Sequence, residues 1–198
     1  MLTVLFLFLI VLSSVAADYS SLNISELTAG DPSLFKADPE VLSLNLNASS
    51  YGWTEYKQCD SRWSSEQLGT CSSTTICSAG CAMSSVAMIL ATKGCSYTPS
   101  TLNSWLKSHS GYANGCDIYW GSVDKLGCTA FQAIETASET EICNGLKAGH
   151  GIVANVNGGS HWVLLTACLG NGVFAVNDPG YSKTSYTKSE ILREAVYH

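Results

Sequence analysis

The sequence has few basic residues. It carries 10 lysine and arginine residues against 16 aspartate and glutamate residues, which gives a formal net charge of −6 at pH 7. A protein that binds nucleic acids needs a basic face to neutralise phosphates. The acidic balance therefore argues against a nucleic-acid partner, and it fits an acidic or extracellular compartment.

Zinc-type motifs and late apolar runs are also missing. No pair of CxxC motifs and no Cys/His set has the spacing of a zinc site, so we expect neither a metal nor another cofactor. After residue 17 no apolar run approaches the length of a membrane span. We therefore expect a soluble monomer with no membrane contact once the N-terminal segment has been removed.

The N-terminal segment is the one long apolar run. Residues 1–17 are almost entirely apolar and end in small residues, with Val15 and Ala17 at the positions that signal peptidases prefer. They predict a signal peptide, and hence a secreted protein or one in the lysosomal or vacuolar lumen. Residues 18–50 are polar and carry glycosylation sequons at Asn23 and Asn47. We interpret them as a linker or pro-segment of a glycoprotein, followed by one domain over residues 51–198.

Cysteines are abundant, and a secreted chain with nine of them is expected to form disulfides. Because nine is odd, at least one thiol stays free. Cys81 would be free if it is a nucleophile, whereas a buried, unpaired Cys168 is the structural alternative. The count does not choose between them, nor does it select one of the 105 pairings of eight cysteines.

The segment around Cys81 predicts a helix that packs against the core. Met83, Val86, Ala87 and Leu90 recur at helical spacing, and Gly94 can end the helix. Cys81 would lie in the first turn, where unpaired N–H groups and the helix dipole favour a thiolate. The alternative is a buried or disulfide-bonded cysteine.

Helices come first and strands later, which indicates an α+β fold. Thr98 caps a second helix with proline at its first position, and Ser138 and Glu141 form a capping box for another. We expect a short helix over residues 118–126 and strands over residues 128–134, 152–156, 161–169 and 173–178.

The last two strands form a hairpin that brings His161 and Asp178 to the same open end. A carboxylate that holds an imidazole is the base half of a nucleophilic triad, and the second ring nitrogen can then face a thiol. Asn177 is an alternative orienting residue, since its amide oxygen also accepts a proton. In the structural alternative, His161 caps a turn and Asp178 is an ordinary turn residue.

Four blocks of sequence resemble the papain-fold cysteine peptidases related to the bacteriocin-processing peptidases, a group similar to family thirty-nine. The blocks are Tyr56–Trp63, Ala79–Met88, Gly159–Leu164 and Val176–Gly180. The resemblance implies a papain-like α+β fold in which the helix that bears the nucleophile packs on an antiparallel sheet. Ala82 departs from the pattern, which usually has glycine after the cysteine.

The resemblance also implies the roles of the site residues: Cys81 as nucleophile, His161 as general base, Asp178 as orienting group and Gln58 as side-chain donor of the oxyanion hole. The expected function is that of a secreted cysteine peptidase, which cleaves peptide or protein substrates through an acyl-thioester. An acyltransferase that uses the same site and a non-catalytic, disulfide-stapled binding module are the alternatives.

Overall fold

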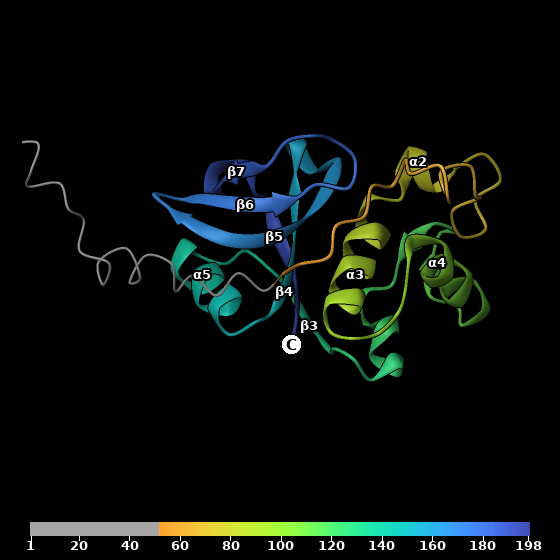
Figure 1. Cartoon of the computed structure of the whole chain (residues 1–198), viewed down its shortest axis with the longest axis horizontal. Helices are drawn as coiled ribbons and strands as arrows, with labels where there is room; N and C mark the ends of the chain where they lie inside the picture. The colour runs from red at the N-terminus through yellow and green to blue at the C-terminus, as the bar shows by residue number, and fades with distance from the viewer. Residues whose placement is uncertain (1–51) are drawn as a thin grey trace, which may run out of the picture. The chain divides into compact units, whose positions relative to one another are not determined.

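The computed structural model describes residues 52–198 (Figure 1). The predicted signal peptide over residues 1–17, the linker or pro-segment over residues 18–50 and the sequons at Asn23 and Asn47 lie outside the described residues. Within residues 52–198, no helix is both long and apolar enough to span a membrane.

In chain order, three α-helices of the described residues precede all the strands, and the fourth lies between two strands of the main sheet. The helices are α2 (Ile76–Ala79), α3 (Cys81–Thr92), α4 (Pro99–Ser108) and α5 (Glu139–Lys147), with 3-10 helices η3 (Trp120–Leu126), η4 (Asn157–Gly159) and η5 (Lys188–Glu190). The strands are β1 (Tyr112–Ala113), β2 (Asp117–Ile118), β3 (Phe131–Glu135), β4 (Gly151–Val156), β5 (His161–Gly170), β6 (Val173–Asn177), β7 (Ser185–Thr187) and β8 (Arg193–Tyr197).

The main sheet is antiparallel and has the strand order β3-β8-β4-β5-β6-β7. Strands β4, β5 and β6 follow one another as a meander, and β8 returns from the end of the chain to lie between β3 and β4. A small second sheet consists of β1 and β2 alone. The α+β architecture predicted from the sequence is confirmed.

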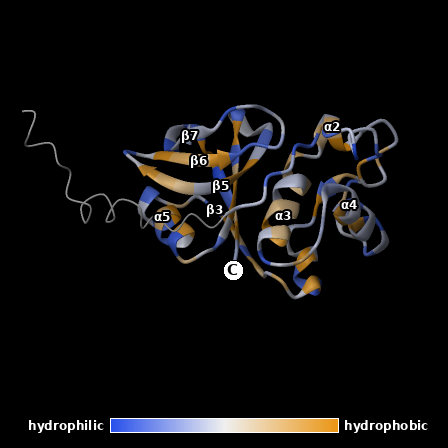
Figure 2. Cartoon of the chain, in the orientation of Figure 1, coloured by the Kyte–Doolittle hydropathy of each residue, from blue (hydrophilic) through white to orange (hydrophobic). Residues whose placement is uncertain are grey.

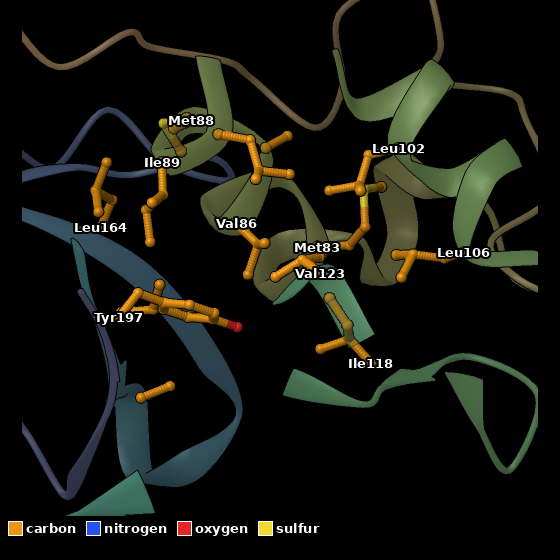
Figure 3. Close-up of a cluster of buried hydrophobic side chains, with 14 of the residues drawn as sticks. Met83, Val86, Met88, Ile89, Leu102, Leu106, Ile118, Val123, Leu164 and Tyr197 are labelled. Atoms are coloured by element: carbon orange, nitrogen blue, oxygen red, sulfur yellow. The ribbon is translucent and has the colours of Figure 1, made fainter. Parts of the chain in front are cut away.

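Helix α3 packs on one face of the main sheet (Figure 3). Val86 and Ile89 of this helix are fully buried in the same cluster as Leu164 of β5 and Tyr197 of β8. Figure 2 shows how hydrophobic residues concentrate along α3 and the central strands. Complete burial of a side chain of this size contributes roughly 1.5–3 kcal/mol, so this cluster fixes where the N-terminus of α3 lies.

The opposite face of the sheet is covered by α5. Neighbouring residues along β4 and β5 alternate between the two faces: Val153 and Leu164 belong to the α3 cluster, whereas Ile152 and Val163 pack with Ile142 of α5. This alternation is what a strand buried on both faces requires.

The predicted helix starts are confirmed. Thr98 and Ser138 accept hydrogen bonds from the N–H groups of Thr101 and Glu141, in capping boxes that open α4 and α5. Gly94 lies just beyond α3 with φ +91°, a conformation that glycine adopts without steric cost.

Two element predictions need correction. The short helix expected over residues 118–126 is present as a 3-10 helix, but it begins only at Trp120, because Ile118 pairs with Tyr112 across β1 and β2. The strand expected from residue 128 begins at Phe131, since Cys128 is tied to Cys95 in a disulfide before the strand starts.

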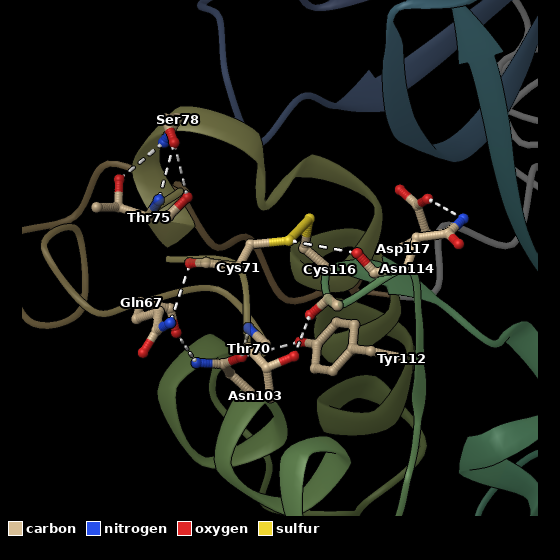
Figure 4. The surroundings of a disulfide bond; sticks show 12 residues. Gln67, Thr70, Cys71, Thr75, Ser78, Asn103, Tyr112, Asn114, Cys116 and Asp117 are labelled. Carbon is tan, nitrogen blue, oxygen red and sulfur yellow. Dashed lines mark hydrogen bonds between the residues drawn. A yellow bond between two sulfur atoms is a disulfide. The ribbon is translucent and has the colours of Figure 1, made fainter. Parts of the chain in front are cut away.

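Four disulfides use eight of the nine cysteines: Cys59–Cys77, Cys71–Cys116, Cys95–Cys128 and Cys143–Cys168. Figure 4 shows Cys71–Cys116 beside a polar network in which Asn103 accepts a hydrogen bond from the Tyr112 hydroxyl. The Gly69 N–H donates to the same oxygen of Asn103. Several disulfides in one chain indicate an oxidising, extracellular type of compartment.

Candidate active site

Cys81 is the first residue of α3 and the free cysteine among the nine. Its N–H therefore belongs to the helix donors that have no intrahelical acceptor. Gly80 makes the junction with α2 possible, since a Cβ at that position would lie 2.5 Å from the carbonyl oxygen of Ile76. Cys168, the alternative free thiol, is bonded to Cys143.

His161 and Asp178 come from neighbouring strands and contact each other directly. The Nε2 atom of His161 lies 2.7 Å from Oδ1 of Asp178, and the two residues are only 5% and 1% exposed. Two β-bulges in the β5–β6 pair set this geometry, because Leu164 pairs with Asn177 only after both bulges have shifted the register. Extension of this register places Asp178 diagonal to His161.

The short segment η4 precedes β5 and places His161 at the start of that strand. Buried Asn155 holds this turn, because its Nδ2 donates to the carbonyl oxygens of Gly159 and His161, each at 3.0 Å. Glycine is required here, since Gly159 has φ +97°. Asn155 was not among the expected site residues, and an asparagine inside an apolar strand is the signal that could have found it.

Asp178 is surrounded by hydrogen-bond donors. The N–H groups of Gly180 and Tyr181 both donate to Oδ1 at 2.9 Å, and the Tyr186 hydroxyl donates to Oδ2 at 3.0 Å. Burial alone would raise the pKa of Asp178, but the hydrogen bonds from His161, Tyr181 and Gly180 outweigh it and lower the pKa below its ordinary value. The carboxylate therefore stays ionised beside the imidazole.

Tyr186 was also missed at the sequence level. It lies in β7, which has only three residues, and nothing in its local sequence marks a functional residue. Burial and the neighbouring Asp178 carboxylate raise the pKa of its hydroxyl, which keeps the proton that it donates.

Cys81 also interacts with His161. Burial lowers the pKa of His161, but hydrogen bonds and charge interactions with Asp178 and Cys81 outweigh burial and raise the pKa to about 9. Because Nε2 is occupied by Asp178, Nδ1 is the ring atom available to the thiol. At neutral pH the imidazole is therefore protonated and lies between a carboxylate and a sulfur.

Gln58 is buried beside this group and 7% exposed. Its backbone N–H donates to the carbonyl oxygen of Pro179 at 2.8 Å, and its Nε2 donates to that of Cys77 at 2.6 Å. An amide nitrogen carries two hydrogens, so Nε2 keeps a second donor. A Cβ at Gly180 would lie 3.3 Å from Oε1 of Gln58 and 3.0 Å from Cε1 of His161, which places these two side chains on the same side of Gly180.

Asn177, the alternative orienting residue, points elsewhere. Its Nδ2 donates to the backbone carbonyl oxygens of Trp53 and Thr54, both at 3.2 Å. Asp178 is thus the residue that holds the imidazole, and Asn177 fastens the N-terminal segment of the described chain to β6.

Tyr181 separates two surface hollows at the site. It is 58% exposed and contacts the His161 ring edge-on, with 4.9 Å between ring centroids. One hollow, of about 630 Å³, lies toward Tyr186 and Lys183, and the other, of about 450 Å³, lies toward Lys57. Both hollows are lined by Gly180 and Tyr181, which adjoin the imidazole of His161.

No three histidine, cysteine or acidic side chains within residues 52–198 gather in the way that would hold a metal ion. The groups that meet at this site can perform nucleophilic chemistry: a free thiol, an imidazolium held by a carboxylate, and unused N–H donors.

A model of the Peptidase_C39 like family matches residues 56–197, a range that contains every residue of the site. A comparison with curated proteins gave no match. Fold, site and family match lead to the same assignment, and the chain belongs to the Peptidase_C39 like family, with a papain-like α+β fold and a peptidase-like function in general.

Proposed function

We propose that this chain is a secreted cysteine peptidase that cleaves amide bonds through an acyl-thioester on Cys81. One observation carries the proposal: the free thiol at the N-terminus of α3 interacts with an imidazole whose other side is held by a hydrogen bond to Asp178. A buried structural cysteine would need neither partner.

In the first half of the reaction, the Cys81 thiolate attacks the substrate carbonyl carbon and the carbonyl oxygen becomes an oxyanion. Imidazolium at His161 then donates its proton to the leaving amine, the C–N bond breaks, and the thioester remains. The raised pKa of His161 supports this step, because the ring is protonated before the substrate arrives.

In the second half, neutral His161 takes a proton from water, whose oxygen attacks the thioester. The C–S bond breaks, the acid product leaves, and the thiolate–imidazolium pair is restored. Asp178 keeps the ring in one orientation throughout and stabilises its positive charge.

The oxyanion would lie between the backbone N–H of Cys81 and the free N–H of Gln58 Nε2. Loss of one such donor typically slows turnover by 10²–10³-fold. The Cys81 N–H supports this assignment because α3 leaves it without an intrahelical acceptor.

The proposal extends to processing and location. Residues 1–17 would be the signal peptide, residues 18–50 a linker or pro-segment and residues 51–198 the peptidase domain. The disulfides support a secreted or lumenal protein. N-terminal sequencing of the protein from culture medium should begin at Asp18, and a start at Met1 would contradict removal of the segment.

Alkylation tests the function directly. Iodoacetamide near pH 6 should label Cys81 alone and abolish cleavage of a mixed peptide library, read by mass spectrometry, and Cys81→Ala should be inactive. Cleavage by the alkylated protein would disprove the role of Cys81. Products joined to an added amine, in place of free acids, would identify an acyltransferase, and an inactive, unlabelled native protein would indicate a binding module.

A further inference from the structure

The disulfide between Cys59 and Cys77 is adjacent to Gln58. Cys59 is the next residue in the chain, and the carbonyl oxygen of Cys77 accepts the Gln58 amide hydrogen at 2.6 Å. One end of the disulfide thus carries the backbone of Gln58, and the other end supplies the acceptor for its side chain.

Gln58 is held from two directions. On the sheet side, its N–H bonds to Pro179, and Lys57 Nζ donates to the carbonyl oxygen of Asp178 at 2.7 Å. On the helix side, the covalent tie is to Cys77, which lies four residues before Cys81 and within α2. The disulfide is therefore a covalent link between the residue after Gln58 and the helix that precedes the thiol.

The side-chain amide has little other support. Oε1 of Gln58 is buried and has no hydrogen-bond partner in the described part of the chain. Burial of an unsatisfied polar atom is unfavourable, and such atoms persist where the surrounding structure holds them or where a ligand completes them. The bond to Cys77 is then what sets the direction of the second Nε2 hydrogen.

We propose that the Cys59–Cys77 disulfide is a positioning element of the oxyanion hole, which acts through Gln58. This inference rests on the proposed function. Opening the disulfide frees Cys77 from Cys59, the Gln58 amide loses its fixed acceptor, and the oxyanion loses one donor. The effect belongs to the transition state, so kcat falls while KM stays unchanged.

The first test replaces both cysteines with serine. Cys59→Ser with Cys77→Ser should lower kcat by about 10²–10³-fold, as Gln58→Ala should, with KM within about twofold and an unchanged rate of Cys81 alkylation. Gln58→Ala added to the double variant should cause no further loss, because both changes remove the same interaction. Retained kcat, or losses that multiply, would overturn the proposal.

A matched control is the pair Cys71→Ser and Cys116→Ser, which removes a disulfide with no bond to Gln58. Assayed well below its melting temperature, this control should keep its kcat. If it loses kcat as much as the Cys59/Cys77 variant does, disulfides act here only through general stability, and the positioning role is wrong.

Native reduction tests the proposal even if the serine variant does not fold. A dithiothreitol thiolate attacks the sulfur of the exposed residue Cys59 and releases the Cys77 thiolate. The second thiol of the reagent then displaces Cys59 from the mixed disulfide, so that dithiothreitol leaves as a cyclic disulfide and both cysteines are thiols. Acid quench, alkylation and mass spectrometry give the opened fraction. Turnover should fall in proportion to that fraction, and full turnover with this disulfide open would refute the role. An inactive oxidised wild type would instead refute the proposed function.

Discussion

Replacement of Asp178 by asparagine separates the charge of this residue from its geometry. The amide oxygen of asparagine can still accept the proton of His161 Nε2, but the negative charge is gone. The pKa of His161 rises from 6.5 to about 9 although burial opposes the rise, which corresponds to about 3 kcal/mol in favour of imidazolium. Cys81 also contributes and asparagine keeps the hydrogen-bond acceptor, so the substitution should lower the pKa of His161 by roughly one unit.

The measurement is the pH dependence of kcat/KM with one peptide substrate. Wild-type activity should decline above about pH 9, where His161 loses the proton that it gives to the leaving amine. Asp178→Asn should move this decline to about pH 8. Asp117→Asn, at an exposed aspartate in β2, is the matched control and should leave it in place. An unmoved decline in Asp178→Asn would refute the argument that Asp178 sets the charge of His161.

Three further predictions concern the same site. Gly180→Ala should lower kcat/KM at least tenfold without unfolding, because the new Cβ meets His161 and Gln58, whereas Gly52→Ala, with open space around it, should have no effect. Tyr186→Phe leaves Oδ2 of Asp178 without its hydrogen-bond donor and should lower the free energy of unfolding, measured in a urea titration, by about 1–3 kcal/mol. The same substitution at an exposed tyrosine is the control, and a loss at Tyr186 no larger than in this control would contradict the prediction. The pKa of His161 is raised in the folded state, so its contribution to stability is complete below about pH 6.5 and is lost as the pH rises through about 9. The urea midpoint of unfolding should therefore fall across that pH window, and this fall should disappear in His161→Gln.

Local sequence was enough for the helix that bears Cys81 and for the hairpin that bears His161. Helical spacing, capping residues and the Gly170–Gly172 turn act within a few residues, so each can be read without knowledge of the fold. The β5–β6 pairing was predicted for the same reason, although the two bulges that set its register were not.

Features that depend on distant contacts could not be read. Strand β8 enters the middle of the sheet although it carries Glu194, whose buried carboxylate accepts from the Ala137 N–H and pairs with Lys188. The disulfide pairing and the hydrogen bond from Tyr186 to Asp178 likewise join segments that no local pattern connects. The reactive groups and Asp178 were therefore predictable, whereas Asn155, Tyr186 and the disulfide partners that support them were not.

The placement of the disulfides has a consequence for how the protein would lose activity on heating. Three of them tie pairs within residues 59–128, the half with Cys81, and the fourth ties Cys143 to Cys168 in the half with His161. No disulfide in residues 52–198 joins the two halves across their interface, which we call the seam. The packing of α3 on β5 and hydrogen bonds such as that from Gln58 to Pro179 hold the two halves together. Cross-links protect each half against unfolding but leave the seam free to loosen. Warming should therefore separate the Cys81 sulfur from the His161 imidazole and abolish the proposed activity, while both halves still keep their secondary structure.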